Sequence, residues 1–223
     1  MLRLRFILAM AFGWMCSQVP ILAQATPFAG GLGGVATLSA DARSLSTSQG
    51  LNVSLYKPEN GPALNIVGGV HLNRYLSVQA SYVWNRNTLT LSSSSSGSNS
   101  FYEERRKSSQ QAILFDLLVY FRRRDDRLRP YLSAGTGVVH LSSTRQNEVA
   151  IGGNPALPPT RFASTRPALR VAVGMDVALT HRLALRYSFG ETIRHNDVSA
   201  QLAPPGKRNL ANFQNLCGLL VRF

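Results

Sequence analysis

The chain has 223 residues, of which 44% are hydrophobic and 16% charged, with 24 Lys and Arg against 11 Asp and Glu. This length suits one or two small soluble domains or one small barrel. The formal net charge of +13 is compatible with nucleic-acid binding, but the chain has no basic-aromatic module and begins like an exported protein, which argues against that class. Only Cys217 lies outside the expected export signal, so an internal disulfide is excluded.

The first 25 residues have the three parts of a secretory signal peptide. A basic start with two arginines is followed by an apolar run over residues 6–15, and Ala23-Gln24-Ala25 fits a small-x-small cleavage site. The apolar run is too short to cross a bilayer, and no later window reaches about 18 unbroken apolar residues. We therefore expect two parts, a signal peptide over residues 1–25 and one domain over residues 26–223.

After the signal, apolar and polar residues alternate with a period of two, which is typical of strands with two different faces. Eight segments show this pattern: residues 28–41, 63–72, 75–91, 110–121, 129–141, 169–179, 183–190 and 213–223. The fifth segment begins Arg129-Pro130-Tyr131 and continues with small residues, so its two faces are hard to tell apart. The other segments, apart from the glycine-rich first one, have a clearly apolar face.

The connections between these segments alternate in length. Those after the second, fourth and sixth segments are short, whereas the other four are long and polar or rich in Pro and Gly. The long ones cover residues 42–62, 92–109, 142–164 and 196–208. Such alternation predicts an up-and-down transmembrane barrel, which has short periplasmic turns and long outer loops.

The two faces differ in chemistry. One is Leu, Val, Ile and aromatic, and the other carries Gly, Ala and Ser together with Asn65, His71, Gln79, Asp116, Arg170, Asp176 and Arg186. Burying such charges in a soluble core is costly, whereas a barrel in lipid needs its apolar face outside. We therefore predict a polar, water-carrying lumen. A soluble barrel with the apolar face inside is left open by the alternation alone.

Aromatic residues near the strand ends predict two interfacial belts. The periplasmic belt would contain Tyr75, Tyr120, Phe121, Tyr131 and Phe223. The outer belt would contain Trp84, Phe189 and Phe213.

The last eleven residues, FQNLCGLLVRF, place Leu219, Val221 and Phe223 on one face of a terminal strand. This strand resembles the closing strand of bacterial outer-membrane barrels, whose terminal Phe is an assembly signal. Together with the Arg129-Pro130-Tyr131 entry and the hairpin pattern, it makes residues 26–223 similar to the small eight-stranded outer-membrane proteins, including the barrel of outer membrane protein A.

The resemblance implies an all-β fold, an eight-stranded antiparallel up-and-down transmembrane β-barrel in the cell outer membrane. It also implies contact with outer-membrane lipid and lipopolysaccharide, and assembly by the barrel-assembly machinery through the C-terminal strand. We expect a monomer without cofactor, metal or nucleic-acid partner.

Three groups of residues are candidates for chemistry. Inside the lumen, Asp116, Arg170, Asp176 and Arg186 predict a salt-bridged plug, with an ion path as the alternative. On the outer side, Arg105, Arg106, Lys107, Lys207 and Arg208 suit lipopolysaccharide phosphates, or are simply solvated. His140 and Ser142 share a strand face, as in outer-membrane lipid A esterases, with Glu148 or Glu191 as the acid, but the sequence fixes only that first pair.

These features predict a non-enzymatic outer-membrane barrel with a structural or surface-interaction role, and a narrow pore as a variant of it. The alternatives are a lipid-modifying enzyme of the outer membrane, similar to lipid A esterases, and a soluble secreted barrel that binds lipid.

Overall fold

The computed structural model describes residues 25–39, 42–46, 52–95, 99–152, 159–195, 197 and 209–223. The predicted signal peptide therefore lies outside the described residues, apart from Ala25. Ten strands occur in the described part of the chain: β1 (Thr26–Ser39), β2 (Ala42–Ser46), β3 (Asn52–Pro58), β4 (Gly61–His71), β5 (Leu76–Ser95), β6 (Ser100–Tyr120), β7 (Leu128–Ile151), β8 (Arg161–Ala178), β9 (Leu183–His195) and β10 (Asn209–Arg222). Across these residues, no helix has the length and hydrophobicity that a membrane crossing needs.

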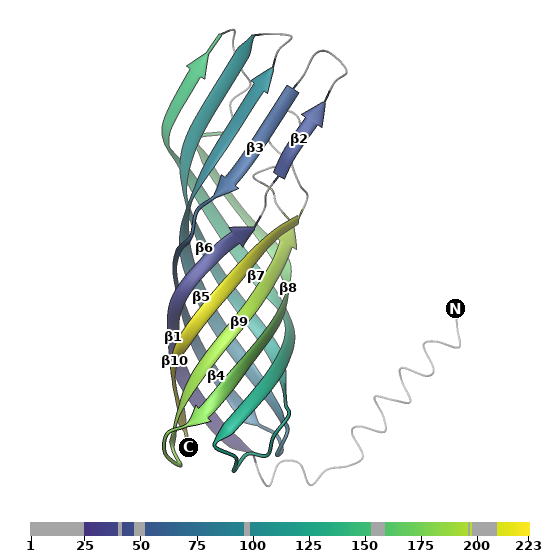
Figure 1. Cartoon of the computed structure of the whole chain (residues 1–223), viewed down its shortest axis with the longest axis vertical. Coiled ribbons are helices and arrows are strands. Elements are labelled where there is room, and N and C mark those ends of the chain that lie inside the picture. The colour runs from purple at the N-terminus through teal and green to yellow at the C-terminus, as the bar shows by residue number, and fades with distance from the viewer. Residues whose placement is uncertain are drawn as a thin grey trace, which may run out of the picture.

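Eight of the strands close into a ring. β1 pairs with both β10 and β4, and the antiparallel order continues through β5, β6, β7, β8 and β9 back to β10 (Figure 1). Closure satisfies every strand edge in the ring, which is a condition for strands in lipid. The predicted eight-stranded antiparallel barrel is confirmed.

The outward face of the ring is apolar, as the alternation predicted. Along the end of β6 and the residue after it, the five outward side chains from Ile113 to Phe121 are 41–63% exposed, while the alternating Leu114, Asp116 and Tyr120 are buried. A stretch of about nine residues is what a tilted strand needs to cross the hydrocarbon core. The soluble register with the apolar face inside is therefore wrong for this chain.

The structure shows which face of β7 points into the barrel, which the sequence left open. Tyr131, Ser133 and Val139 point inward and are buried, whereas Leu132 and Val138 are about half exposed on the outer wall. The belt prediction is consequently wrong for two of its tyrosines: Tyr131 and the inward residue Tyr120 lie inside the barrel, where each is nearly fully buried. A buried tyrosine needs a partner for its hydroxyl, and the lumen offers polar ones.

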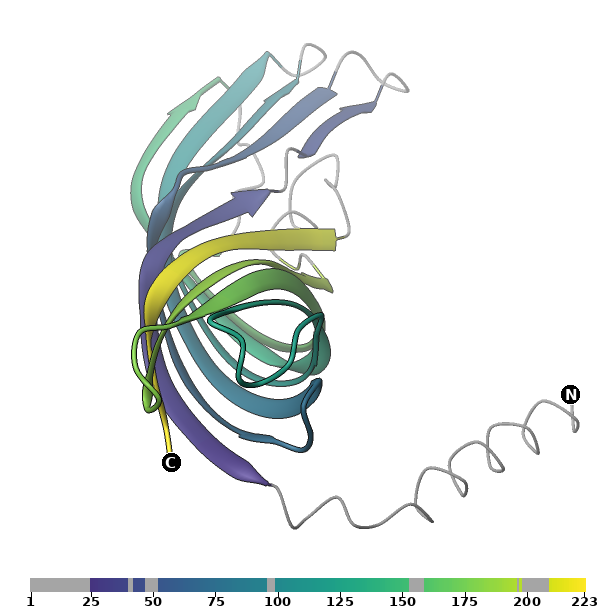
Figure 2. The same ribbon diagram turned by 60° about the horizontal axis from the view of Figure 1, so that its bottom comes forward.

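The strands are longer than predicted. Most of the segments expected as loops over residues 42–62, 92–109 and 142–164 are strands, because the period of two continues above the membrane with polar outward residues. β2 and β3 form a hairpin that pairs with the upper part of β5. With the upper parts of β5, β6 and β7 they make an upright sheet above the ring (Figures 1 and 2). The short turns and the C-terminal end lie at the opposite, periplasmic end (Figure 1).

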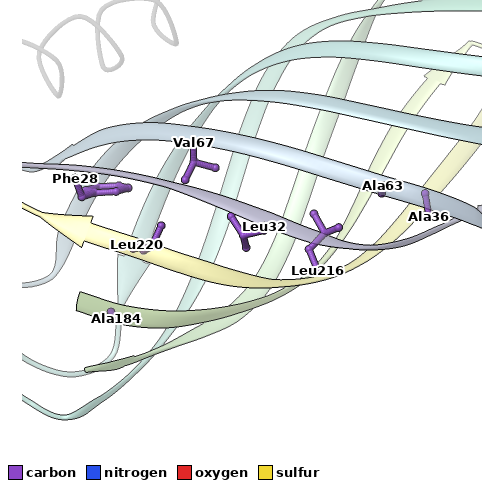
Figure 3. Packing of buried hydrophobic residues seen from close by; sticks show 8 residues of the cluster. All are labelled: Phe28, Leu32, Ala36, Ala63, Val67, Ala184, Leu216 and Leu220. Atoms are coloured by element: carbon purple, nitrogen blue, oxygen red, sulfur yellow. The ribbon is translucent and has the colours of Figure 1, made fainter. Parts of the chain in front are cut away.

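The interior is packed with side chains and is only partly polar. An apolar wall runs along β1, β4, β9 and β10, formed by Phe28, Leu32, Ala36, Ala63, Val67, Ala184, Leu216 and Leu220 (Figure 3). Charged and amide side chains fill the rest of the interior and come from all around the ring, for example Gln79 on β5, Asp116 on β6 and Arg186 on β9. The expected water-carrying polar lumen therefore needs correction: an eight-stranded ring is narrow enough for side chains to fill it.

Candidate functional site in the barrel lumen

Arg186 occupies the centre of the periplasmic half of the lumen. The period of two on β9 turns Leu185 and Tyr187 outward, so Arg186 between them points inward and is only 1% exposed. Its Nε donates to Asp176 Oδ1 at 2.6 Å and its Nη2 donates to Asp176 Oδ2 at 2.8 Å. This forked pair, the strongest geometry for Arg and a carboxylate, joins β9 to β8.

Two further side chains complete the shell of Arg186. Its Nη1 donates to Gln79 Oε1 at 2.5 Å, and its Nη2 donates to the Tyr120 hydroxyl at 2.8 Å. The Tyr120 hydroxyl in turn donates to Asp176 Oδ2 at 2.9 Å. We call Gln79, Tyr120, Asp176 and Arg186 the central cluster. It connects β5, β6, β8 and β9 across the lumen, and such fully bonded networks are rigid.

Aromatic rings pack around the central cluster. The guanidinium carbon of Arg186 lies 5.0 Å from the ring centre of Tyr131 and 5.4 Å from that of Phe28. A Cβ atom built on Gly174 would lie 2.4 Å from the Tyr131 ring, so only glycine leaves room for that ring. Backbone, ring and ion pair together fill this level of the barrel.

The other two predicted lumen charges form a pair one level nearer the outer side. Arg170 Nη1 donates to Asp116 Oδ2 at 3.2 Å, and both side chains are nearly fully buried. Gly135 on β7 makes space here, because a Cβ atom at that position would lie 2.2 Å from Asp116 Oδ1. The structure thus brings all four predicted lumen charges inside the ring and joins them in two ion pairs.

Amide side chains form a third level. Asn85 Nδ2 donates to Asn87 Oδ1 at 2.6 Å, and Asn212 Nδ2 donates to Asn85 Oδ1 at 3.1 Å and to Gln110 Oε1 at 3.2 Å. All four side chains are buried. This level links β5, β6 and β10 near the height where the outward apolar band ends.

The outer mouth carries an apolar level and a charged one. Leu38, Leu89, Leu91, Tyr102, Leu141 and Leu210 form a buried cluster. Burial raises the pKa of Tyr102 to about 12, so its hydroxyl is neutral at physiological pH. Nearby, Glu104 accepts from Arg106 Nη1 and from Arg145 Nε, both at 2.7 Å.

The basic residues predicted to form one patch on the outer side point to opposite faces of β6. Arg106 is 1% exposed and paired inside, so its prediction as a lipopolysaccharide-facing residue is wrong. Arg105 and Lys107 point outward, since they are its neighbours on β6, and Arg105 pairs with Glu59 at 3.2 Å. The sequence expectation treated this stretch as a loop, whereas a strand alternates its side chains. Lys207 and Arg208 lie outside the described residues.

His140 and Ser142 lie on the outward face of β7. His140 Nδ1 is 2.9 Å from Thr165 Oγ1, and within the described ranges no hydrogen bond joins it to Ser142. Of the two candidate acids, Glu148 pairs with Arg145. A serine nucleophile needs a base that is itself oriented by a third group, and the described residues show no such group at His140.

The closing strand carries its predicted apolar stripe on the outside. Leu219, Val221 and Phe223 are 47%, 41% and 73% exposed. The backbone N–H of Phe223 donates to Pro27 O at 3.0 Å, so the final residue still takes part in the seam between β10 and β1.

Sequence reasoning missed Tyr120 and Phe28 as members of the lumen site. For Tyr120 the sequence pattern did point inward, because Tyr120 lies four residues after Asp116 and therefore on the same face of the strand. Its position at a strand end favoured the belt interpretation instead. For Phe28 the glycine-rich sequence that follows hid the alternation.

No group of three or more His, Cys, Asp or Glu side chains suited to a metal ion occurs among the described residues. The polar side chains that line the lumen are mainly Arg, Asp and amides, which suit packing and ion pairing.

The sequence of residues 7–203 matches the family described as the outer membrane protein beta-barrel domain. The chain belongs to this family. Because the match covers most of the chain, the outer-membrane β-barrel is its main structural unit, and the outer membrane is its location. No curated protein sequence matches the chain significantly.

Solved structures agree on the fold of this outer-membrane barrel. Neisserial surface protein A is similar with a TM-score of 0.52 at 14% identity, covering 89% of this chain and 99% of that chain. The outer membrane protein OprG from Pseudomonas aeruginosa gives a TM-score of 0.50 at 12% identity, covering 90% and 96%. At this level of identity the likeness shows the fold and carries no specific role.

Proposed function

We propose that this protein is a non-enzymatic, non-conducting outer-membrane barrel that holds an upright sheet at the cell surface for interaction. The observation that carries the proposal is the central cluster, in which a fully bonded Arg186 spans the lumen between β5, β6, β8 and β9. Bulk ion flow needs a continuous aqueous path, and bonded side chains occupy that space at this level.

The levels above the central cluster support the same conclusion. The Asp116–Arg170 pair, the amide level and the apolar cluster at the outer mouth each fill the interior at another height. A narrow pore would have to pass all of them. A packed lumen is instead suited to a rigid anchor whose functional surface lies outside the membrane.

Single-channel recording in planar bilayers tests this proposal. We expect negligible conductance for the wild type, and also for Arg186→Ala, because the other levels remain in place. Heat-modifiable gel mobility would verify that both proteins are folded before insertion. Reproducible conductance steps in the wild type would overturn the proposal and favour the pore.

We also infer that lipopolysaccharide contacts the outer rim through outward basic side chains. Arg86 on β5 and Lys107 on β6 are exposed on the outer surface, where Arg86 follows the outward Trp84 by two residues. Arg86 lies opposite Ser109 and Lys107 opposite Thr88. Such neighbouring cations suit the phosphates of lipid A. They replace the contiguous patch that the sequence suggested.

Binding of purified lipopolysaccharide to the folded protein tests this contact. The Arg86→Gln/Lys107→Gln variant should bind several-fold more weakly than the wild type, with a smaller dependence on salt. Arg182→Gln, which removes a charge from a periplasmic turn, is the matched control and should bind like the wild type. Equal affinity in all three proteins would rule the contact out.

The proposal of a non-enzymatic role has a separate test. Among the described residues, the side-chain hydrogen bond of His140 is with Thr165 and not with Ser142. A strain carrying Ser142→Ala should therefore have the same lipid A acylation pattern as the parent strain, and a changed pattern would favour the esterase alternative.

A further inference from the structure

The periplasmic mouth of the barrel contains a cavity of about 830 Å³ with a basic lining. Three turns and both terminal strands of the ring contribute to it. Its charged side chains are Arg74, Arg124, Asp125, Arg127 and Arg222, and we call this set the mouth site. Arg124 reaches across to β1, where its Nη1 donates to Thr26 Oγ1 at 2.5 Å.

The mouth site has more positive charge than its surroundings neutralise. Four arginines face one lining carboxylate, Asp125, and among the described residues none of these five side chains forms an ion pair. The nearby Asp126 accepts the backbone N–H of Arg123 within its own turn. The inner carboxylate, Asp176, is already bonded to Arg186 and Tyr120.

Two of the guanidinium groups at this end are buried with unused donors. Arg222 is 7% exposed, and its Nε and Nη2 have no hydrogen-bond partner in the described structure. Behind it, Arg129 is fully buried, and its Nε and Nη1 are likewise without a partner. Buried charged donors are costly unless something accepts from them, and most buried polar groups in proteins are bonded.

We propose that the mouth site binds a phosphate group. Several guanidinium forks that converge on one cavity match the tetrahedral set of oxygens on phosphate, and arginine binds phosphate with two parallel hydrogen bonds. The bound anion would pair with the guanidinium of Arg222, which lines the cavity, and would reduce the repulsion among the arginines. This assignment is independent of whether the lumen conducts.

Two sources can supply this phosphate: a soluble phosphate ion of the periplasm or the headgroup of a phospholipid in the inner leaflet. The cavity is also lined by Leu179, the residue after the end of β8, whose side chain is 51% exposed. The mouth site is thus open both to water and toward lipid. An experiment with two arms separates the sources.

In the first arm, isothermal titration measures binding of inorganic phosphate to the folded protein in zwitterionic detergent at low salt. In the second arm, native mass spectrometry measures phosphatidylglycerol that is retained against an excess of phosphatidylcholine. Both arms use the wild type, Arg222→Gln, Arg124→Gln and the matched control Arg122→Gln. Arg122 lies in the same turn as Arg124 but does not line the cavity.

Phosphate binding that falls at least tenfold in Arg222→Gln and Arg124→Gln but not in Arg122→Gln would support a site for the soluble anion. Selective retention of phosphatidylglycerol with the same variant pattern would support a headgroup site. Because Arg222 lies in the closing strand, its variant needs a folding check by gel mobility, whereas Arg124 lies in a turn and tests the site without that risk. Binding in neither arm, or equal loss in the control, would overturn the proposal.

Discussion

Among the buried arginines of the barrel, those at the centre and those at the periplasmic end differ sharply in their hydrogen bonding. In the central cluster, Arg186 donates four hydrogen bonds to Asp176, Gln79 and Tyr120. At the periplasmic end, Arg129 and Arg222 are as well buried but leave four nitrogen atoms without a partner in the described structure. Both groups lie in one lumen and have the same side chain, so the difference comes from the partners that the neighbouring strands supply.

This contrast separates stability from binding. A bonded ion pair that fills its cavity has nothing left to offer a ligand, and its removal leaves an uncompensated charge. An arginine without acceptors is costly in the free protein and gains most from an anion that arrives later. The central cluster therefore stabilises the fold, whereas the arginines at the periplasmic mouth are suited to binding an anion.

The largest effect that follows from this contrast is expected for Asp176→Ala. The substitution leaves Arg186 buried without its carboxylate, and breaking such a pair typically costs about 3–5 kcal/mol. Urea-induced unfolding from lipid vesicles would measure the free energy. Asp125→Ala is the control, since Asp125 is exposed and unpaired in the described structure, and its effect should stay within about 0.5 kcal/mol.

A double-mutant cycle tests the coupling directly. Because Asp176 and Arg186 act as one unit, the double substitution to alanine should cost less than the sum of the two single ones, by more than about 0.5 kcal/mol. Strictly additive losses would mean that the pair does not stabilise the centre.

The ring and its orientation were predictable because the signal is periodic. Alternation in β6, β8 and β9 gives both the strand and its outward face, and a lipid-facing wall must be apolar over its whole height. The apolar outward stripe identifies a strand only where the outward face contacts lipid. Above the membrane the outward face meets water, so the strand continues without a hydrophobic stripe. The sequence pattern therefore predicts a loop around Arg106, where the structure has a strand.

The lumen was predictable only as a set of inward residues. Alternation shows that Asp116, Arg170, Asp176 and Arg186 point inward, but pairing depends on the stagger between strands, which the sequence does not state. Asp176 lies opposite Arg186 in the register of β8 and β9, whereas Arg170 meets Asp116 without being its register partner. Tyr120 and Gln79 also reach the central cluster because of the stagger between strands, which the sequence does not state.

The glycine beneath Tyr131 gives a second, smaller effect. In Gly174→Ala the new Cβ would lie 2.4 Å from the Tyr131 ring, so the packed centre must shift, at a cost of about 1–3 kcal/mol. Gly33→Ala is the matched control, because no heavy atom lies within 4 Å of a Cβ at that outward position. Equal unfolding free energies for the two variants would show that the centre is not tightly packed.

The smallest effect, and the sharpest test of the contrast, is expected for Arg129→Met. Two of the three side-chain nitrogens of Arg129 have no partner in the described structure, and its remaining contacts are the Tyr120 ring at 3.9 Å and a bond to Arg74 O at 3.4 Å. Replacing a poorly paired buried charge by an apolar side chain of similar length is often neutral. We therefore expect Arg129→Met to change the unfolding free energy by less than about 1 kcal/mol in phosphate-free buffer.

Arg186→Met provides the comparison for this variant, since it removes the same charge from the bonded centre and should be several-fold more destabilising. If both variants lose the same stability, the two arginine groups are energetically equivalent, and their unequal bonding carries no functional meaning. If only Arg186→Met is destabilised, Arg129 is retained for a reason other than folding, because the folded barrel gains little from it.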